Sequence, residues 1–265
     1  MKRLIPILSL AVLWSLSPSW AQLEAPSELG VSMGHLHLIA RNVEAEKRVW
    51  IAMGGKPIRV EGEEVIKFPG MLVFVTQGSP EKSQEGSAMN HPGIRITDTD
   101  FLGRLKAAGV KVKLADPSVP DGFAYTTEDM RVELNPGDQS QTAPVITEHL
   151  HWDMPASLRP QALAWYVNIF GAKQTRGNSA DLPGAGLRYG MNTGSPDAPL
   201  PTKGRTLDHI GFEVKNLEAF CKKLEASGIR FDKPYSKTRH KGFASAELTD
   251  PWGTSIELTE GLSRY

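Results

Sequence analysis

The chain has 265 residues, and its 30 lysines and arginines balance 30 aspartates and glutamates. This balance lacks the basic excess of a nucleic-acid-binding protein and argues against that class. A single cysteine, Cys221, excludes an internal disulfide, so stability must come from packed cores. Its place in a helical apolar pattern indicates a packing role.

Residues 1–21 have the pattern of a secretory signal peptide. Met1, Lys2 and Arg3 form a charged start, an apolar run covers 4–16, and small residues lead to Ala21. The apolar run is too short to cross a bilayer, which takes ~20 such residues. We therefore expect cleavage after Ala21, a periplasmic or secreted protein, and no membrane association after cleavage. The remainder, about 240 residues, can build two cores of ordinary size.

The first half of the remaining chain predicts two helices and eight short strands. Apolar residues at helical spacing indicate helices at 43–53 and 101–108, each followed by glycine. The predicted strands are 35–40, 58–60, 64–68, 71–76, 93–97, 110–114, 123–126 and 130–134.

The second half repeats this order. Helices are expected at 158–170 and from about 217, and an eighth strand is expected before Thr206. The other predicted strands are 149–153, 173–176, 186–189, 209–214, 230–232, 244–248 and 255–258. The polar, turn-rich segment 135–144 separates the halves, so we predict two α+β domains, 33–138 and 145–262, with helices packed on one face of each sheet.

Six of the seven histidines and two glutamates occupy matching places in the two halves. They are His35, His37, His91 and Glu133 in the first half, and His149, His151, His209 and Glu257 in the second. Alternate residues of a strand point to one face, so His149 and His151 look the same way. Imidazole, imidazole and carboxylate form a ligand set for a divalent metal ion, and its repetition favours metal binding over two chance occurrences.

The motifs resemble those of the vicinal oxygen chelate superfamily, which includes glyoxalases, bleomycin-resistance proteins and extradiol dioxygenases. The resemblance covers about 33–261, as two consecutive domains. It is carried by Glu148-His149-Leu150, by Asp208-His209-Ile210-Gly211-Phe212, and by Asp250-Pro251-Trp252-Gly253 leading to Glu257. It implies that each domain consists of two βαβββ modules curled into a cup, with metal ligands on its first, fifth and eighth strands.

Carried over by position, the resemblance implies one metal site made by His149, His209 and Glu257. A second possible site would consist of His35, His91 and Glu133. We expect the carboxy-terminal site to be the better one, because the turn Asp250-Pro-Trp-Gly has no counterpart in the first half. His151 would then lie beside the metal ion as an outer or substrate contact.

The same resemblance implies an exported, metal-dependent enzyme for a small substrate with vicinal oxygens. An extradiol-type dioxygenase would use Fe(II); a glyoxalase-like lyase or an epimerase would use zinc, nickel or manganese. A tyrosine of the dioxygenase pattern is replaced by Glu247, so Glu247, His240 and His151 are the candidate acid–base residues. Export argues against a cytosolic thiol cosubstrate.

Four aromatic residues are candidates for lining a substrate pocket. They are Tyr189, Phe212, Tyr235 and Trp252. A non-catalytic antibiotic-binding protein is the alternative from another functional class, and it predicts ligand capture without product. The expected partner is a small molecule rather than nucleic acid, and a homodimer is a further possibility that the sequence leaves open.

Overall fold

The computed structural model describes residues 23–82, 84–190, 198–237 and 242–265. The predicted signal peptide, 1–21, and the candidate residue His240 lie outside the described residues. Within the described ranges, none of the helices is both long and apolar enough to cross a membrane.

The chain forms four modules, each with a strand, a helix and three further strands. The first contains β1 (Val31–Ala40), α1 (Val43–Ala52), β2 (Lys56–Val60), β3 (Glu63–Phe68) and β4 (Met71–Gln77). The second contains β5 (Met89–Ile96), α2 (Phe101–Ala107), β6 (Val112–Leu114), β7 (Gly122–Tyr125) and β8 (Arg131–Pro136). The third contains β9 (Val145–Asp153), α3 (Arg159–Phe170), β10 (Lys173–Gln174), β11 (Ser179–Leu182) and β12 (Ala185–Gly190). The fourth contains β13 (Leu207–Val214), α4 (Leu217–Ala226), β14 (Lys233–Lys237), β15 (Ala244–Thr249) and β16 (Ser255–Glu260), followed by the short helix η2 (Leu262–Arg264).

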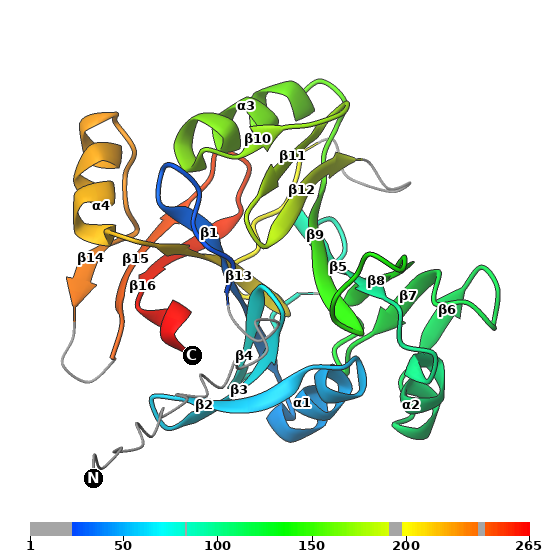
Figure 1. Ribbon diagram of the computed structural model, residues 1–265. Helices are drawn as coiled ribbons and strands as arrows, with labels where there is room; N and C mark the ends of the chain where they lie inside the picture. Colours follow the sequence, from blue (N-terminus) through cyan, green and yellow to red (C-terminus); the bar gives the residue numbers. More distant parts are fainter. Residues whose placement is uncertain (1–22, 83, 191–197, 238–241) are drawn as a thin grey trace, which may run out of the picture.

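These modules build two curled, eight-stranded sheets (Figure 1). The outer sheet combines the first and last modules in the strand order β14-β15-β16-β13-β1-β4-β3-β2. The inner sheet combines the second and third modules in the order β10-β11-β12-β9-β5-β8-β7-β6. At the centre of each sheet two first strands of modules run antiparallel, β1 beside β13 and β5 beside β9. The predicted α+β class with βαβββ modules is confirmed.

This pairing corrects the predicted division into domains 33–138 and 145–262. Each sheet takes one module from each half, so neither sheet is continuous in sequence. The segment between β8 and β9 is short and is bound to the end of β5: Gly137 N donates to Ile96 O at 2.7 Å, and Thr97 N to Pro144 O at 2.9 Å. Because β5 lies between β8 and β9, the second and third modules share a sheet and leave the first to join the fourth.

The helices cover one face of the sheets, and the metal-ligand candidates lie on the other face. Helix α3 contacts β10, β11 and β12, and α4 contacts β14, β15 and β16. Phe170 of α3 packs on Phe212 of β13, with ring centroids 4.7 Å apart. Trp152 of β9 donates from its indole to Thr254 Oγ1 at 2.9 Å. These buried contacts join the inner and outer sheets through one apolar core.

Local sequence explains where most elements begin and end. Asn42 and Asn216 cap α1 and α4 by accepting from backbone amides, and Gly171 ends α3 in the left-handed conformation. Strand β11, Ser179–Leu182, is the second-half strand expected somewhere before Thr206. A correction concerns β14, which begins at Lys233 rather than within 230–232.

Candidate metal centres

Each sheet places a histidine, a glycine and a glutamate in one row across three neighbouring strands. In the outer sheet His35 of β1 pairs with Gly211 of β13, which pairs with Glu257 of β16. Paired residues project from the same face, so the histidine and glutamate meet above the glycine. His209, two residues before that glycine on β13, projects from the same face and completes a set of three, which we call the outer site.

The outer site brings its three ligand groups within bonding reach of a common point. His35 Nε2 lies 3.0 Å from Glu257 Oε2, and His209 Nε2 lies 3.5 Å from the same oxygen. One ligand atom from each residue lies within 4.8 Å of the others. The Glu257 side chain is only 12% exposed, so the carboxylate is almost enclosed by the two imidazoles and the sheet.

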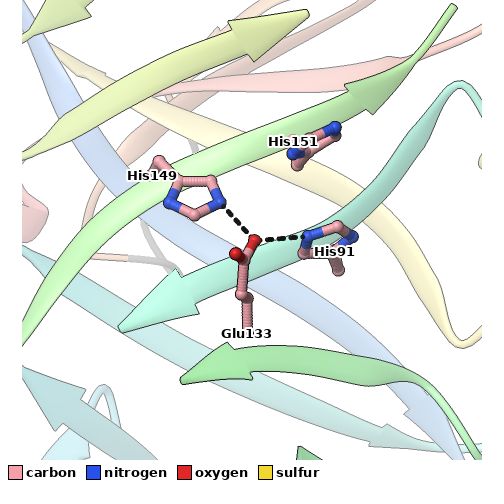
Figure 2. A group of neighbouring side chains, drawn as sticks. All are labelled: His91, Glu133, His149 and His151. Carbon is pink, nitrogen blue, oxygen red and sulfur yellow. Dashed lines mark hydrogen bonds and ion pairs between the residues drawn. The ribbon is translucent and has the colours of Figure 1, made fainter. Parts of the chain in front are cut away.

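The inner sheet repeats the row with His149 of β9, Gly93 of β5 and Glu133 of β8. His91, two residues before the glycine, lies with its Nε2 3.0 Å from Glu133 Oε2, and His149 Nε2 lies 3.1 Å from the same oxygen. Figure 2 shows both imidazoles directed at the carboxylate, with His151 beside them. We call these four residues the inner site.

The glycine in each row makes room for an imidazole. A Cβ atom on Gly211 would lie 2.0 Å from the ring of His35, and one on Gly93 would lie 2.3 Å from the ring of His149. Such distances are far inside van der Waals contact. Glycine in a strand therefore marks a close approach here, and it allows each ring to lie directly over the middle strand.

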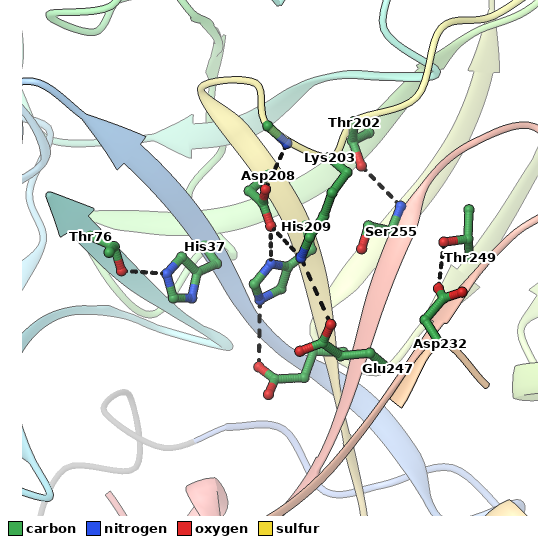
Figure 3. Close-up of polar contacts among 12 residues, drawn as sticks. His37, Thr76, Thr202, Lys203, Asp208, His209, Asp232, Glu247, Thr249 and Ser255 are labelled. Atoms are coloured by element: carbon green, nitrogen blue, oxygen red, sulfur yellow. Dashed lines mark hydrogen bonds and ion pairs between the residues drawn. The ribbon is translucent and has the colours of Figure 1, made fainter. Parts of the chain in front are cut away.

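Hydrogen bonds around the outer site orient its ligands. Asp208 Oδ1 accepts from His209 Nδ1 at 2.7 Å, and this leaves His209 Nε2 free to face Glu257. Asp208 is held in turn by Lys203 Nζ at 2.9 Å and by Gly204 N at 2.8 Å. Figure 3 shows Lys203 between Asp208 and Glu247, with a contact to each.

The pKa shifts of the outer site follow from burial and from these contacts. Burial acts to raise the pKa of Glu257, but the adjacent imidazoles of His209 and His35 outweigh it and hold the pKa well below its ordinary value. Burial acts to lower the pKa of His209, but Asp208 and Glu257 raise it above its ordinary value. The metal-free site is therefore an ion-paired cluster with its carboxylate charged.

The inner site has a different set of outer contacts. His91 Nδ1 is 2.8 Å from Asn90 Oδ1, which also accepts from the guanidinium of Arg131. His149 Nδ1 is 3.6 Å from Glu148 Oε2. Although burial acts to raise it, the neighbouring His149 imidazole and a hydrogen bond from the Arg95 guanidinium lower the pKa of Glu148 to about 2. Both ring nitrogens of His91 and His149 are thus engaged.

A second histidine accompanies each site. Burial and the neighbouring imidazoles lower the pKa of both His37 and His151 to about 3. His37 Nε2 lies 2.6 Å from Thr76 Oγ1, whereas His151 stacks on His91 with ring centroids 4.6 Å apart. The prediction that His151 lies beside a possible metal ion fits this placement, although the ligands next to it are those of the inner site.

The outer site forms part of the wall of a cavity of about 480 Å³. Glu247 of β15 pairs directly with Glu257 of β16 and lines this cavity. Its carboxylate is 2.6 Å from Lys233 Nζ and 3.8 Å from Lys203 Nζ. The alternation of side chains along a strand could not predict which way Glu247 points, because a turn separates it from Glu257. The register of β15 against β16 shows that Glu247 faces the outer site.

Residues 153–258 match the family model described as the Glyoxalase/Bleomycin resistance protein/Dioxygenase superfamily. The predicted resemblance to this superfamily is confirmed. Solved structures with the same fold include glyoxalase I from Zea mays, with a TM-score of 0.65, 15% identity, and coverage of 87% of this chain and 92% of that one. A putative dioxygenase from Bacillus subtilis has a TM-score of 0.59, 13% identity, and coverage of 91% and 86%. No curated protein sequence matches the chain significantly.

The superfamily's ligand strands are recovered once the modules are paired as the structure pairs them. The first, fifth and eighth strands of the outer sheet, counted module by module, are β1, β13 and β16. Those of the inner sheet are β9, β5 and β8 when the third module is counted before the second. The predicted grouping of His149 with His209 and Glu257 was therefore wrong, as was that of His35 with His91 and Glu133. All six residues are ligand candidates, but His35 and His149 exchange places.

The aromatic candidates do not line the outer cavity. Phe212 and Tyr189 are buried in the core, with Tyr189 stacked on Trp152 at 5.1 Å. Phe212 follows Gly211, so alternation directs it to the face opposite the metal site. Tyr235 and Trp252 pack against the same core and are not among the cavity's lining residues. The prediction of these four as pocket residues is corrected accordingly.

Sequence reasoning missed the residues that form the rest of the cavity wall. They are chiefly Phe74, Thr76, Lys203, Phe243 and Leu262, which lie beside His37 of the repeated histidine pattern. Phe74 pairs with His37 across β1 and β4, two neighbouring strands of the first module. Leu262 comes from η2 after the last strand. Of these residues, only Lys203 could have been suspected from the sequence, because it lies five residues before Asp208, next to the ligand His209.

Proposed function

We propose that the chain is a divalent-metal-dependent enzyme acting on a small substrate with two adjacent oxygens, and that the outer site is its catalytic centre. The observation that carries the proposal is the convergence of His35, His209 and Glu257 at the wall of a 480 Å³ cavity. A cavity of that size suits a small organic molecule.

The residues of the outer site fit a divalent metal ion. His209 Nε2 is buried and lies 3.5 Å from Glu257 Oε2, too far for a close hydrogen bond, which suits a nitrogen reserved for coordination. Two imidazoles and a carboxylate are a donor set used for iron, zinc, nickel and manganese. A bound ion would act as a Lewis acid and would lower the pKa of a coordinated substrate hydroxyl.

The protein's own groups favour proton transfer as the reaction. Glu247 faces the cavity directly opposite Glu257, and Lys233 and Lys203 hold its carboxylate in place. A carboxylate in this position can remove a proton from a carbon next to a substrate carbonyl and return it at a neighbouring atom. This is the chemistry of a glyoxalase-like or epimerase-type lyase or isomerase.

The cavity wall indicates the shape of the substrate. Phe74, Phe243 and Leu262 provide apolar surface, while Lys203 and Glu247 provide charge on another side. A substrate with an apolar portion and a polar end carrying two oxygens would match both surfaces.

Ring cleavage by an extradiol-type dioxygenase is the second candidate. It is favoured by the donor set itself, because two histidines and one carboxylate are the arrangement of non-haem Fe(II) oxygenases. We rank ring cleavage below proton transfer, because Glu247 replaces a tyrosine of the dioxygenase pattern.

Elemental analysis of anaerobically purified protein, combined with two assays, tests these proposals. Proton transfer predicts zinc, nickel or manganese and exchange of a substrate carbon-bound proton with D₂O. Ring cleavage predicts iron and oxygen uptake with catechols. His209→Ala should abolish either activity. Full turnover by metal-free protein would refute the proposal, and stoichiometric ligand capture without product would identify an antibiotic-type binding protein.

Export is a separate proposal that rests on residues 1–21. We propose that the mature protein begins after Ala21 and is periplasmic or secreted. Intact-mass measurement of protein from its native host would test the cleavage, and retention of Met1 to Ala21 would refute it. The same preparation would show by light scattering whether the chain forms the homodimer considered above.

A further inference from the structure

We propose that the inner site is a closed, four-donor zinc site in which His151 joins His91, His149 and Glu133, and that its ion stabilises the fold. This goes beyond the proposed function, because it assigns a different role to the second cluster. It does not depend on catalysis at the outer site.

The number of converging side chains differs between the two sites. One ligand atom from each of four residues lies within 4.8 Å of the others at the inner site, but among the residues that the structure describes only three satisfy this at the outer site. His37, which occupies the place of His151 in the repeat, is the residue left out. Figure 2 shows His151 on the side of β9 that carries His149, next to His91.

A difference between threonine and glycine at one matching position explains why His37 does not join the outer cluster, whereas His151 can join the inner one. Thr76 of β4 pairs with Ile39 on β1, and Gly190 of β12 occupies the matching place beside Asp153 on β9. Thr76 Oγ1 lies 2.6 Å from His37 Nε2 and ties that ring to β4. Gly190 offers no side chain.

The absence of a side chain at Gly190 leaves room for the His151 ring. A Cβ atom at Gly190 would lie 2.8 Å from His151 Nε2. That nitrogen is buried and has no hydrogen-bond partner among the described residues; Asp153 Oδ1 lies 3.7 Å away. An unsatisfied buried imidazole nitrogen costs free energy. This cost falls if metal binding draws the His151 ring toward the cluster and orients its Nδ1 atom.

The inner ligands are also better oriented before an ion binds. Asn90 and Glu148 engage the Nδ1 atoms of His91 and His149. In the outer site Gly34 stands where Glu148 stands in the repeat, and His35 Nδ1 is buried without a hydrogen-bond partner among the described residues. Outer contacts of this kind fix ring orientation and raise metal affinity by about 10–100-fold.

Donor number separates the roles of the two sites. Three imidazoles and a carboxylate fill a tetrahedral shell, which is the geometry that zinc adopts in structural sites and which leaves no position for a substrate. Three donors leave positions open at the outer site. An inner ion would also join β9 to β5 and β8, strands that come from opposite halves of the chain.

Single-site variants of the full chain test the proposal by spectroscopy. His209→Ala leaves only the inner site, and His91→Ala leaves only the outer one. We expect Co(II) in the His209→Ala protein to show the intense visible bands of tetrahedral coordination. The His91→Ala protein should show the weak bands of a six-coordinate ion. Six-coordinate spectra from both proteins would overturn the proposal.

The role of His151 is tested by adding His151→Ala to the His209→Ala protein, with His37→Ala added to the His91→Ala protein as the matched control. Zinc affinity, measured by chelator competition, should fall roughly 100-fold in the first pair, since even the loss of an outer contact costs about 10–100-fold. In the control pair, zinc affinity should change less than threefold. His151→Asn provides a second variant of similar shape if the alanine protein fails to fold.

The outcomes separate this proposal from the proposed function. Equal losses in the two pairs, or no loss in the first, would show that the sites are equivalent and would overturn it. A zinc-dependent rise in melting temperature in His209→Ala that His151→Ala removes would support it, even if the wild-type chain showed no turnover. Turnover that survives in His91→Ala would place catalysis at the outer site independently.

Discussion

His35 of β1 lies directly across from Gly211 of β13, and its imidazole covers the glycine so closely that a Cβ there would lie 2.0 Å from the ring. The pair comes from opposite ends of the chain, and it places the outer site at the contact between the first and last modules. Metal binding at this site therefore depends on the crosswise pairing of modules.

Gly211→Ala should remove the outer metal ion. The added methyl group must displace the His35 ring, and overpacking of this kind costs about 1–3 kcal/mol of stability. Gly93→Ala is the matched variant, because its Cβ would meet His149 and should remove the inner ion instead. Metal content per chain and thermal unfolding check both. Two ions retained in Gly211→Ala would contradict the geometry.

Asp208→Asn should weaken metal binding at the outer site by about 10–100-fold, because Asp208 orients His209 and is itself held by Lys203. The inner site already has an asparagine, Asn90, at the equivalent position. Chelator competition on the two single-site chains measures the change. Asp232→Asn, whose carboxylate accepts from Thr249 instead, is the control and should leave both affinities unchanged.

The six ligand residues could be predicted from the sequence because a duplicated pattern exposes them. Their grouping could not, since His35 and His149 occur in the same motif and exchange places without any change in spacing. Which first strands pair is decided by contacts spread over whole modules. The short segment 137–144, which holds β9 beside β5, was the one local feature that favoured the observed pairing.

The prediction of aromatic pocket residues was wrong at Phe212 for a reason that the alternation of side chains along β13 could have revealed. Once His209 faces the metal, Gly211 must face it too, and Phe212 must face the core. The cavity residues Phe74 and Leu262 could not be predicted together, because they come from the first and last modules and line one cavity only where these modules share a sheet.

The metal-free chain should lose stability as the pH falls from 6.5 to 4.5. The folded-state pKa of His37 is lowered to about 3 from 6.5, mainly by burial, so in this window the unfolded chain binds a proton that the folded chain does not. Stability from such a group is complete above pH 6.5 and is lost on acidification, at about 1 kcal/mol per pH unit. Urea unfolding in EDTA measures it.

Two comparisons isolate the effect of His37. His37→Gln can still bond to Thr76 but does not titrate, so it should reduce the slope. His151, with a similarly lowered pKa, and His91, whose pKa is also lowered by burial, contribute to the slope that remains. His209 has a raised pKa, so its contribution is complete below pH 6.5 and is lost only as the pH rises through the folded value. A stability that rises on acidification across the window would contradict this account.

Glu247→Gln should reduce turnover by about 10²–10⁴-fold, the usual contribution of a general base. The amide keeps the size of the side chain and can still accept from Lys233, but it cannot take a proton. Because Glu247 is not among the converging ligand groups, the outer ion should be retained, and the loss should fall on kcat more than on KM. Ser245→Ala, two residues earlier on β15 and away from the cavity lining, is the control. If Glu247→Gln kept wild-type kcat while His209→Ala abolished it, the base would have to be another group, and oxygen chemistry at the same three ligands would become the better account of the site.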